Sequence, residues 1–282
     1  MTPWKSGMKQ MPEKRYLDLL KKTLSFMLWQ DPPKPLTAYR TNSPVKRLVV
    51  ATISKILDKQ DMQIVKNSNF SDVQRINGTV WINYAHTMIG LKRLDNLQYC
   101  IETVLNEGVE GDFIETGVWR GGACIFMRGI LAVYGIKNRK VFVADSFKGL
   151  PKPNEKYSAD IDDKGYTYKY LAVSKNEVED NFRKYGLLDD KVIFIEGWFK
   201  DTLPTIPIEK LAILRLDGDL YESTIVALKN LYPKLSYGGF CIIDDYGLTN
   251  CKYAVDDYRA KYNIKSEMKI IDSSSIYWRK GK

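Results

Sequence analysis

The chain has 282 residues, of which 44% are hydrophobic and 27% charged, a composition typical of a globular protein with one sizeable core. No apolar run reaches the roughly 18 residues of a membrane span, and the first residues lack the apolar segment of a secretory signal, so we expect a cytoplasmic protein without a membrane partner. The formal charge of +9 arises from 43 basic residues interleaved with 34 acidic ones, which disfavours a nucleic-acid groove.

The first predicted element is a helix over residues 11–29. Its leucines recur at steps of three and four residues, which places them on one face; they are Leu17, Leu20, Leu24 and Leu28. This face serves either packing or a homo-oligomer contact. Three prolines within residues 31–35 end any helix there. We therefore expect residues 1–80 to form a helical extension and residues 81–282 to form the main domain.

The main domain alternates apolar bursts with amphipathic stretches. A helical pattern over residues 94–107 ends at Gly108, and further helical patterns cover residues 123–133, 177–185 and 223–231. The expected strands are residues 112–115, 140–144, 192–196, 211–216 and 240–243, followed by a hairpin of residues 268–271 and 276–279. Continuous apolar strands predict a sheet that is covered on both faces and mostly parallel. The predicted fold is α/β: a Rossmann-like, doubly wound, seven-stranded sheet closed by an antiparallel hairpin, similar in outline to class I methyltransferases.

A glycine-rich turn follows the first strand of the domain, Glu115-Thr-Gly-Val-Trp-Arg-Gly-Gly122. Glycines at this place let a ligand approach the backbone closely. The spacing departs from the G-x-G-x-x-G of dinucleotide sites. An acid at the turn suits S-adenosylmethionine, which carries an ammonium and a sulfonium, although a purely structural turn remains an alternative.

The second strand ends at Asp145, thirty residues after Glu115. An acid at this position can accept hydrogen bonds from both hydroxyls of a ribose. The pair favours a nucleoside ligand. Binding of NAD, or a capping role without a ligand, stays open on these residues alone.

Two acidic clusters end the fourth and fifth of the expected strands, which are successive along the chain; they are Asp217-Gly-Asp219 and Asp244-Asp245. Carboxylates at neighbouring strand ends repel one another unless a positive charge lies between them, and Mg²⁺ prefers such oxygen ligands. The four cysteines are too widely spaced for a zinc site and are expected to be buried thiols. Helix caps and surface acids are the alternative interpretation of the aspartates.

These acids suggest a chemistry. A sugar hydroxyl must lose its proton as it attacks a methyl group, which a divalent cation and a neighbouring carboxylate both favour. We assign Asp217 as the base and Asp244 and Asp245 as metal ligands. The only histidine, His86, precedes the predicted sheet and is a weak candidate for this role.

A polar, tyrosine-rich stretch covers residues 150–178 and is longer than the usual connection of about 2–6 residues. Its tyrosines include Tyr157, Tyr166 and Tyr168. We expect either a lid whose tyrosines stack on the acceptor or a disordered surface loop.

With these residues, the chain resembles the macrocin O-methyltransferase (TylF-type) family, which methylates deoxysugars of natural products with S-adenosylmethionine and Mg²⁺. The resemblance runs from Thr87 to the C-terminus, and the stretch before residue 80 lacks recognisable motifs. It rests on the motifs TMIGLKRLDNL from Thr87, ETGVWRGG from Glu115, ADSFKGLP from Ala144, GWFKDTLP from Gly197, LRLDGDLYEST from Leu214 and IIDDY from Ile242.

The resemblance implies that Asp217 is both base and metal ligand, with Asp244 and Asp245 completing the metal site. It also implies a cofactor site formed by Met88, Glu115, Thr116, Gly117, Val118, Trp119, Gly121, Asp145, Ser146, Phe147 and Trp198. The acceptor is expected to be a sugar or glycoside. A competing enzyme class is a nucleotide-sugar glycosyltransferase, because Asp217-Gly-Asp219 also satisfies the metal-binding D-x-D pattern.

Overall fold

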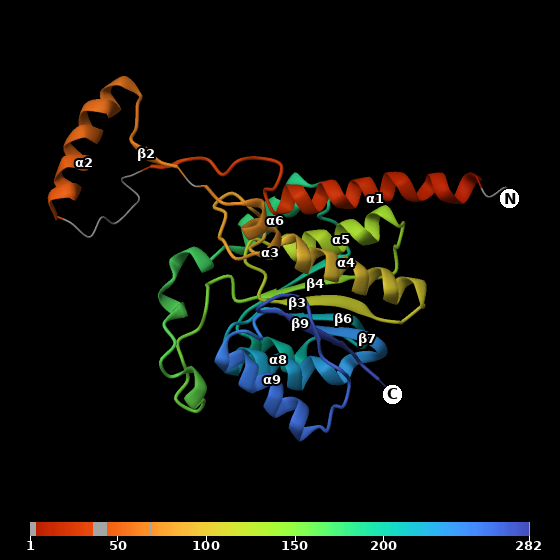
Figure 1. Ribbon diagram of the computed structural model, residues 1–282. Helices are drawn as coiled ribbons and strands as arrows, with labels where there is room; N and C mark the ends of the chain where they lie inside the picture. Colours follow the sequence, from red (N-terminus) through yellow and green to blue (C-terminus); the bar gives the residue numbers. More distant parts are fainter. Residues whose placement is uncertain (1–3, 36–43, 68, 282) are drawn as a thin grey trace.

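A computed structural model describes residues 4–35, 44–67 and 69–281, and its centre is one seven-stranded sheet (Figure 1). The strand order is β5-β4-β3-β6-β7-β9-β8. The strands are β3 (Asp112–Thr116), β4 (Val141–Asp145), β5 (Val192–Glu196), β6 (Leu211–Leu216), β7 (Leu235–Ile243), β8 (Lys269–Ile270) and β9 (Ile276–Arg279). The strands from β3 to β7 pair in parallel, whereas β9 runs antiparallel to β7 and to β8. The predicted fold class is confirmed.

Helices cover both faces of the sheet (Figure 1). One face carries α1 (Trp4–Leu24), α4 (Leu91–Asn106), α5 (Gly122–Val133) and α6 (Lys175–Lys184), and the other carries α8 (Tyr221–Leu231) and α9 (Thr249–Lys261). The short helix α7 (Phe199–Thr202) follows β5. Every residue of β6 is buried, because this central strand lies between two hydrophobic cores. Such burial on both faces explains why the parallel strands are continuously apolar.

The first helix packs within the chain. Leu17, Leu20 and Leu24 belong to the same core as α5, and a Cβ added at Gly129 of α5 would lie 2.5 Å from Leu20 Cδ2. Leu28 lies in a turn beyond the helix and is 43% exposed, so the predicted end at residue 29 was wrong. The leucine stripe therefore serves packing and is not left free for an oligomer contact.

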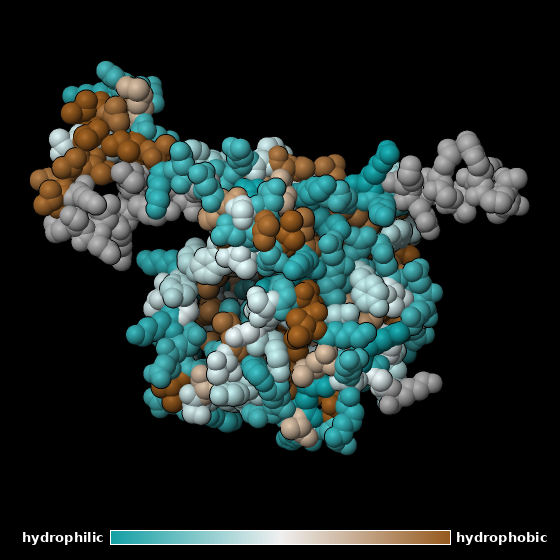
Figure 2. Space-filling view, viewed as in Figure 1, coloured by the Kyte–Doolittle hydropathy of each residue, from teal (hydrophilic) through white to brown (hydrophobic). Residues whose placement is uncertain are grey.

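A second N-terminal helix stands away from the body. Helix α2 (Pro44–Leu57) projects at the upper left of Figure 1, beyond the short pair β1 (Lys34–Pro35) and β2 (Val65–Lys66). Figure 2 shows hydrophobic residues gathered on this helix. Helix α3 (Asp72–Asn77) then begins with a capping box at Ser71 and Gln74. Among the described residues, no helix is long and apolar enough to cross a membrane.

Candidate active site

A cavity of about 770 Å³ opens at the carboxyl ends of the parallel strands. It lies where the connections after β3 and β6 leave in opposite directions, which is the usual ligand site of an open α/β sheet. Most predicted site residues line it: Met88, Glu115, Gly117, Val118, Trp119, Asp145, Ser146, Trp198, Asp217, Asp244 and Asp245. Thr116, Gly121 and Phe147 do not line it. The Phe147 ring instead packs against Phe194, with centroids 6.2 Å apart.

The glycine-rich turn passes very close to the end of β6. Gly117 has a φ of +84°, and a Cβ at this position would overlap the carbonyl oxygen of Asp217. Gly121, also at φ +84°, is the N-cap residue of α5. Trp119 between them has a φ of +46°, which is uncommon for a bulky residue. The turn thus presents its backbone to the cavity for reasons of sterics.

Asp145 fixes the same turn from the end of β4. Its Oδ2 accepts a hydrogen bond from the Val118 N–H at 2.7 Å, and its Oδ1 accepts one from the Phe147 N–H at 2.7 Å. Burial raises the pKa of this carboxyl, and the backbone N–H groups oppose that rise. Ser146 Oγ also lies 3.4 Å from Oδ1. Asp145 lines the cavity, where its carboxylate can accept hydrogen bonds from a ligand.

Both carboxylate oxygens of Glu115 already have partners within the protein. Its Oε1 forms an ion pair with Arg215 Nη1, and its Oε2 accepts from Cys124 Sγ at 3.0 Å. Burial raises the pKa of Glu115 to about 7, against the lowering effect of Arg215. The carboxylate that we expected to suit a positively charged ligand is thus already paired with a guanidinium, although Glu115 also lines the cavity.

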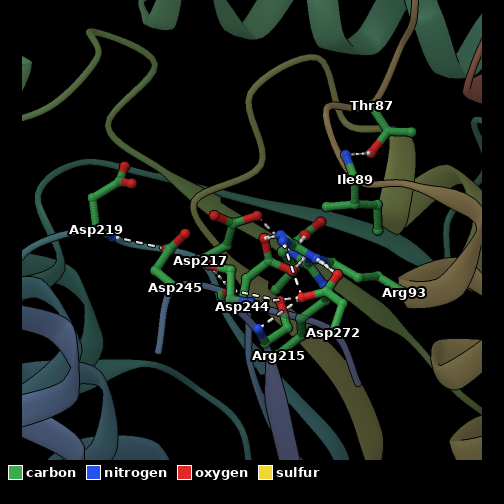
Figure 3. Close-up of polar contacts among 12 residues, drawn as sticks. Thr87, Ile89, Arg93, Arg215, Asp217, Asp219, Asp244, Asp245 and Asp272 are labelled. Atoms are coloured by element: carbon green, nitrogen blue, oxygen red, sulfur yellow. Dashed lines mark hydrogen bonds and ion pairs between the residues drawn. The ribbon is translucent and has the colours of Figure 1, made fainter. Parts of the chain in front are cut away.

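Two arginines lie among the acids, Arg215, which is buried, and Arg93, which is partly buried. Arg215 Nη1 donates to Asp217 Oδ2 at 2.8 Å, and its Nη2 pairs with Asp244 Oδ1. Arg93 Nη1 lies 2.5 Å from Asp244 Oδ2, and Arg93 Nε lies 2.6 Å from Asp272 Oδ2 (Figure 3). Both oxygens of Asp244 are thus held by guanidinium groups.

Sequence reasoning missed Arg93, Arg215 and Asp272. Arg215 left a signal, because a charged residue within the apolar run Leu-Arg-Leu requires a buried partner. Arg93 and Asp272 left no signal in the sequence, because their contacts are so distant along the chain. Arg93 is 179 positions from Asp272 and 151 positions from Asp244.

The three predicted metal ligands come together. Asp217, Asp244 and Asp245 each offer one carboxylate oxygen, and these oxygens lie within 4.8 Å of one another. Asp245 Oδ2 accepts a hydrogen bond from the Asp219 N–H at 3.1 Å. Figure 3 shows Asp245 and Asp219 to one side of the arginine cluster.

The acids exceed the arginines in charge. Six carboxylates (Glu115, Asp217, Asp219, Asp244, Asp245 and Asp272) adjoin two guanidiniums, an excess of four negative charges when all are ionised. Burial and the neighbouring Asp217 raise the pKa of Asp219 to about 7, and burial and Asp219 raise that of Asp245 well above its usual range. The arginines supply part of the charge that we expected from a metal, and the remaining excess suits a cation.

The tyrosine-rich stretch is an ordered flap over the cavity. It contains three short 3₁₀ turns, Ser158–Asp160, Gly165–Thr167 and Lys169–Leu171. Buried Asp160 accepts hydrogen bonds from the Tyr221 and Glu222 N–H groups at 2.8 and 2.9 Å, which caps α8. Of the tyrosines singled out from the sequence, Tyr168 lines the cavity, whereas Tyr157 packs on Tyr221 and Tyr166 faces solvent.

His86 and the cysteines are structural. His86 Nδ1 lies 2.7 Å from Tyr185 Oη outside the cavity, and burial, with Lys184 and Arg120, lowers its pKa to about 4. All four cysteines are buried and free, as predicted.

The sheet order and the site at its carboxyl edge define a class I methyltransferase. The fold of CalS11, described as a calicheamicin methyltransferase, is similar, with a TM-score of 0.57 at 19% identity over 89% of this chain and 98% of that one. The O-methyltransferase NovP is much closer, with a TM-score of 0.82 at 44% identity over 96% of this chain and all of that chain.

The chain belongs to the macrocin-O-methyltransferase (TylF) family, whose model matches residues 13–280. One relative, from Streptomyces olivaceus, is 8-demethyl-8-(2,3-dimethoxy-alpha-L-rhamnosyl)-tetracenomycin-C 4'-O-methyltransferase, 46% identical over 94% of this chain and 92% of its own length. Another is demethyldecarbamoylnovobiocin O-methyltransferase from Streptomyces niveus, 47% identical over 94% of this chain and 93% of its own. A third, from Micromonospora griseorubida, is mycinamicin III 3''-O-methyltransferase, 45% identical over 94% and 96%.

These similarities settle two expectations. The chain is an O-methyltransferase, so the glycosyltransferase interpretation of Asp217-Gly-Asp219 is wrong. The family also extends to residue 13, well before Thr87, where the recognisable motifs begin.

Proposed function

We propose that this O-methyltransferase transfers the methyl group of S-adenosylmethionine to a hydroxyl of a sugar carried by a small molecule. The names of two relatives support a sugar acceptor, since one specifies a rhamnosyl group and the other a 3'' position. The observation that carries the proposal is the convergence of Asp217, Asp244 and Asp245 in the cavity that Gly117 and Asp145 also line.

The cofactor would bind along the glycine-rich turn. Asp145 is placed to accept from the ribose hydroxyls, and Met88 and Trp198 border the same cavity. The donor supplies an electrophilic methyl group on a sulfonium. Because Glu115 already pairs with Arg215, its part here is to hold that arginine and the end of β3 in place.

Asp217, Asp244 and Asp245 would hold Mg²⁺, since their oxygens lie close enough to share one ion and belong to the ligand type that this ion prefers. When bound, the ion would supply positive charge that favours loss of the hydroxyl proton. Arg93 and Arg215 fix the Asp244 carboxylate before any ion arrives. This preorganisation lowers the cost of ordering the ligands.

Asp217 would accept the proton. Its backbone lies against Gly117 and its residue lines the cavity, and the hydrogen bond from Arg215 orients one carboxylate oxygen while leaving the other available. Asp219, two residues on, lines the same cavity and is the competing candidate.

The direct test is incubation with S-adenosylmethionine, Mg²⁺ and a panel of glycosides, with S-adenosylhomocysteine as the measured product. We expect the chelator EDTA to abolish turnover and added Mg²⁺ to restore it. Asp217→Asn should lower turnover by at least about a hundredfold, as expected for loss of a general base, while calorimetry shows its affinity for S-adenosylmethionine nearly unchanged.

Asp219→Asn is the matched control in the same loop. Near-normal turnover in Asp217→Asn together with loss in Asp219→Asn would move the base to Asp219. Full activity in EDTA would remove the metal from the proposal.

The N-terminal region raises two further points. We retain the division into an extension of residues 1–80 and a domain of residues 81–282 as a prediction.

An oligomer formed through the extension also remains a proposal. The feature that supports it is the exposed apolar side of α2, which includes Val45, Leu48 and Ile56. Light scattering of the intact chain tests it.

A further inference from the structure

Three aromatic side chains meet at the cavity. Trp81 and Tyr170 have ring centroids 5.0 Å apart with planes tilted by 55°, and Tyr168 and Tyr170 stack at 5.7 Å with planes within 19°. Trp81 precedes α4, whereas the two tyrosines come from the flap after β4. All three line the cavity, and together they form what we call the aromatic platform.

The platform is largely uncovered. Trp81 is 56% exposed, Tyr168 50% and Tyr170 45%. Within the described part of the chain, the Trp81 indole and the hydroxyls of the two tyrosines form no hydrogen bond. Aromatic side chains normally bury a large area, and a contiguous exposed apolar patch beside a cavity marks a binding surface.

The platform is attached to the glycine-rich turn that follows β3. Trp119 Nε1 donates a hydrogen bond to the Tyr170 carbonyl oxygen at 2.9 Å, which ties the flap to the turn that begins at Gly117. Trp81 lies in the segment between Gly78 and Gly90. The backbones of these two glycines are so close that neither has room for a Cβ, so the two ends of this segment lie side by side.

The platform and the acid cluster border the same cavity. Trp81, Tyr168 and Tyr170 line it together with Asp217 and Asp219. A molecule whose reacting hydroxyl lies at Asp217 can therefore rest its more distant rings on the platform.

We propose that the aromatic platform is the aglycone subsite: it binds a flat, unsaturated or aromatic ring system that is attached to the sugar to be methylated. The proposal rests on the proposed function and specifies its acceptor. Stacking suits a rigid planar aglycone because a ring face placed on Trp or Tyr gains contact without the loss of many rotatable bonds. The competing acceptor is an anionic one, because Lys152, Lys164 and Lys200 also line the cavity and form no ion pair among the described residues.

The test compares two probes that share a sugar, 4-methylumbelliferyl α-L-rhamnoside and methyl α-L-rhamnoside. Their affinities are measured by calorimetry on the full chain with S-adenosylhomocysteine and Mg²⁺ present. We expect the aromatic glycoside to bind wild type at least about tenfold more tightly, a typical effect of a good aromatic stack. Trp81→Ala and Tyr170→Ala should bring this ratio close to one.

The controls separate stacking from damage to the fold. Tyr170→Phe keeps the ring and should keep the ratio, and Tyr253→Ala removes an aromatic residue that is equally exposed but lies on α9, outside the cavity. Affinity for S-adenosylhomocysteine should be the same in all variants. A glycoside with a flexible alkyl chain in place of the coumarin should gain less.

Three results would overturn the subsite. They are equal binding of both probes by wild type, no binding of the aromatic probe at millimolar concentration, and a ratio that survives both alanine substitutions. The subsite would also be overturned if a nucleoside diphosphate sugar bound more tightly than the aromatic glycoside. Loss of that binding in Lys200→Ala but not in Trp81→Ala would show that the cavity takes an anionic acceptor. Methyl transfer is scored separately, so a chain that binds the aromatic probe at the platform but methylates no glycoside would contradict the proposed function alone.

Discussion

At the residue scale, the site depends on a few side chains whose positions are fixed by contacts across the sheet. Asp217, Asp244 and Asp245 could be predicted to converge, because parallel strands bring their carboxyl ends to one edge of a sheet. The pairing of both Asp244 oxygens with Arg93 and Arg215 could not, because it depends on side-chain directions from three separate elements. The ion pair between Glu115 and Arg215 could not be predicted for the same reason.

Gly117 gives the first prediction. An alanine there must adopt a φ of +84° and also push its Cβ into the Asp217 carbonyl, so Gly117→Ala should lower the free energy of unfolding by about 3 kcal/mol or more. Gly135→Ala is matched, since Gly135 has a φ of +68° but no atom within 4 Å of the added Cβ. This control should cost only about 1 kcal/mol. Urea denaturation measures both, and equal losses would refute the steric argument.

Arg93 gives the second prediction. Arg93→Met keeps most of the side-chain volume but leaves Asp244 and Asp272 without this partner, so the free energy of unfolding should fall by about 3 kcal/mol. Mn²⁺ affinity, measured by calorimetry, should also fall, because Asp244 loses its orientation. Arg183→Met, which breaks only exposed pairs on α6, should change neither quantity appreciably. Unchanged Mn²⁺ affinity in Arg93→Met would show that the arginine does not position the ligand.

At the element scale, apolar periodicity located most strands and helices, while their ends depended on partners distant in the sequence. The strand predicted for residues 240–243 is the second half of β7, which begins at Leu235. Its first half contains Ser236, Tyr237 and two glycines and looks like a loop, but a shift of register lets it pair at Leu211. The predicted hairpin is present, although β8 contributes only two residues.

Helix α1 gives the third prediction. Leu24 is fully buried in the core shared with α5, so Leu24→Ala should lower the free energy of unfolding of the whole chain by about 2–5 kcal/mol. Exposed Leu19→Ala, on the same helix, should change it by less than about 0.5 kcal/mol. The measurement is urea denaturation followed both by circular dichroism and by tryptophan fluorescence. A negligible effect of Leu24→Ala would mean that α1 takes no part in the folding of the core.

At the scale of the whole molecule, the sequence predicted a doubly wound sheet closed by a hairpin and the edge at which its site lies. The packing of α1 against α5 and the outward position of α2 could not be predicted from the sequence. Both depend on which apolar helix faces are covered by other parts of the chain (Figure 1). Trp81 precedes α4 and the two tyrosines follow β4, so only the folded chain brings Trp81 to Tyr170. The aglycone subsite that we propose is therefore a property of the tertiary structure.

The central claim is that three carboxylates at the edge of the sheet hold one divalent ion beside the methyl donor. Anomalous diffraction from crystals grown with Mn²⁺ and S-adenosylhomocysteine tests it most directly. We predict a single strong peak at coordination distance, about 2.0–2.3 Å, from one oxygen each of Asp217, Asp244 and Asp245, with the ribose of the bound nucleoside at Asp145. A crystal with the nucleoside bound and no anomalous peak at these three aspartates, or with the peak elsewhere, would contradict the account.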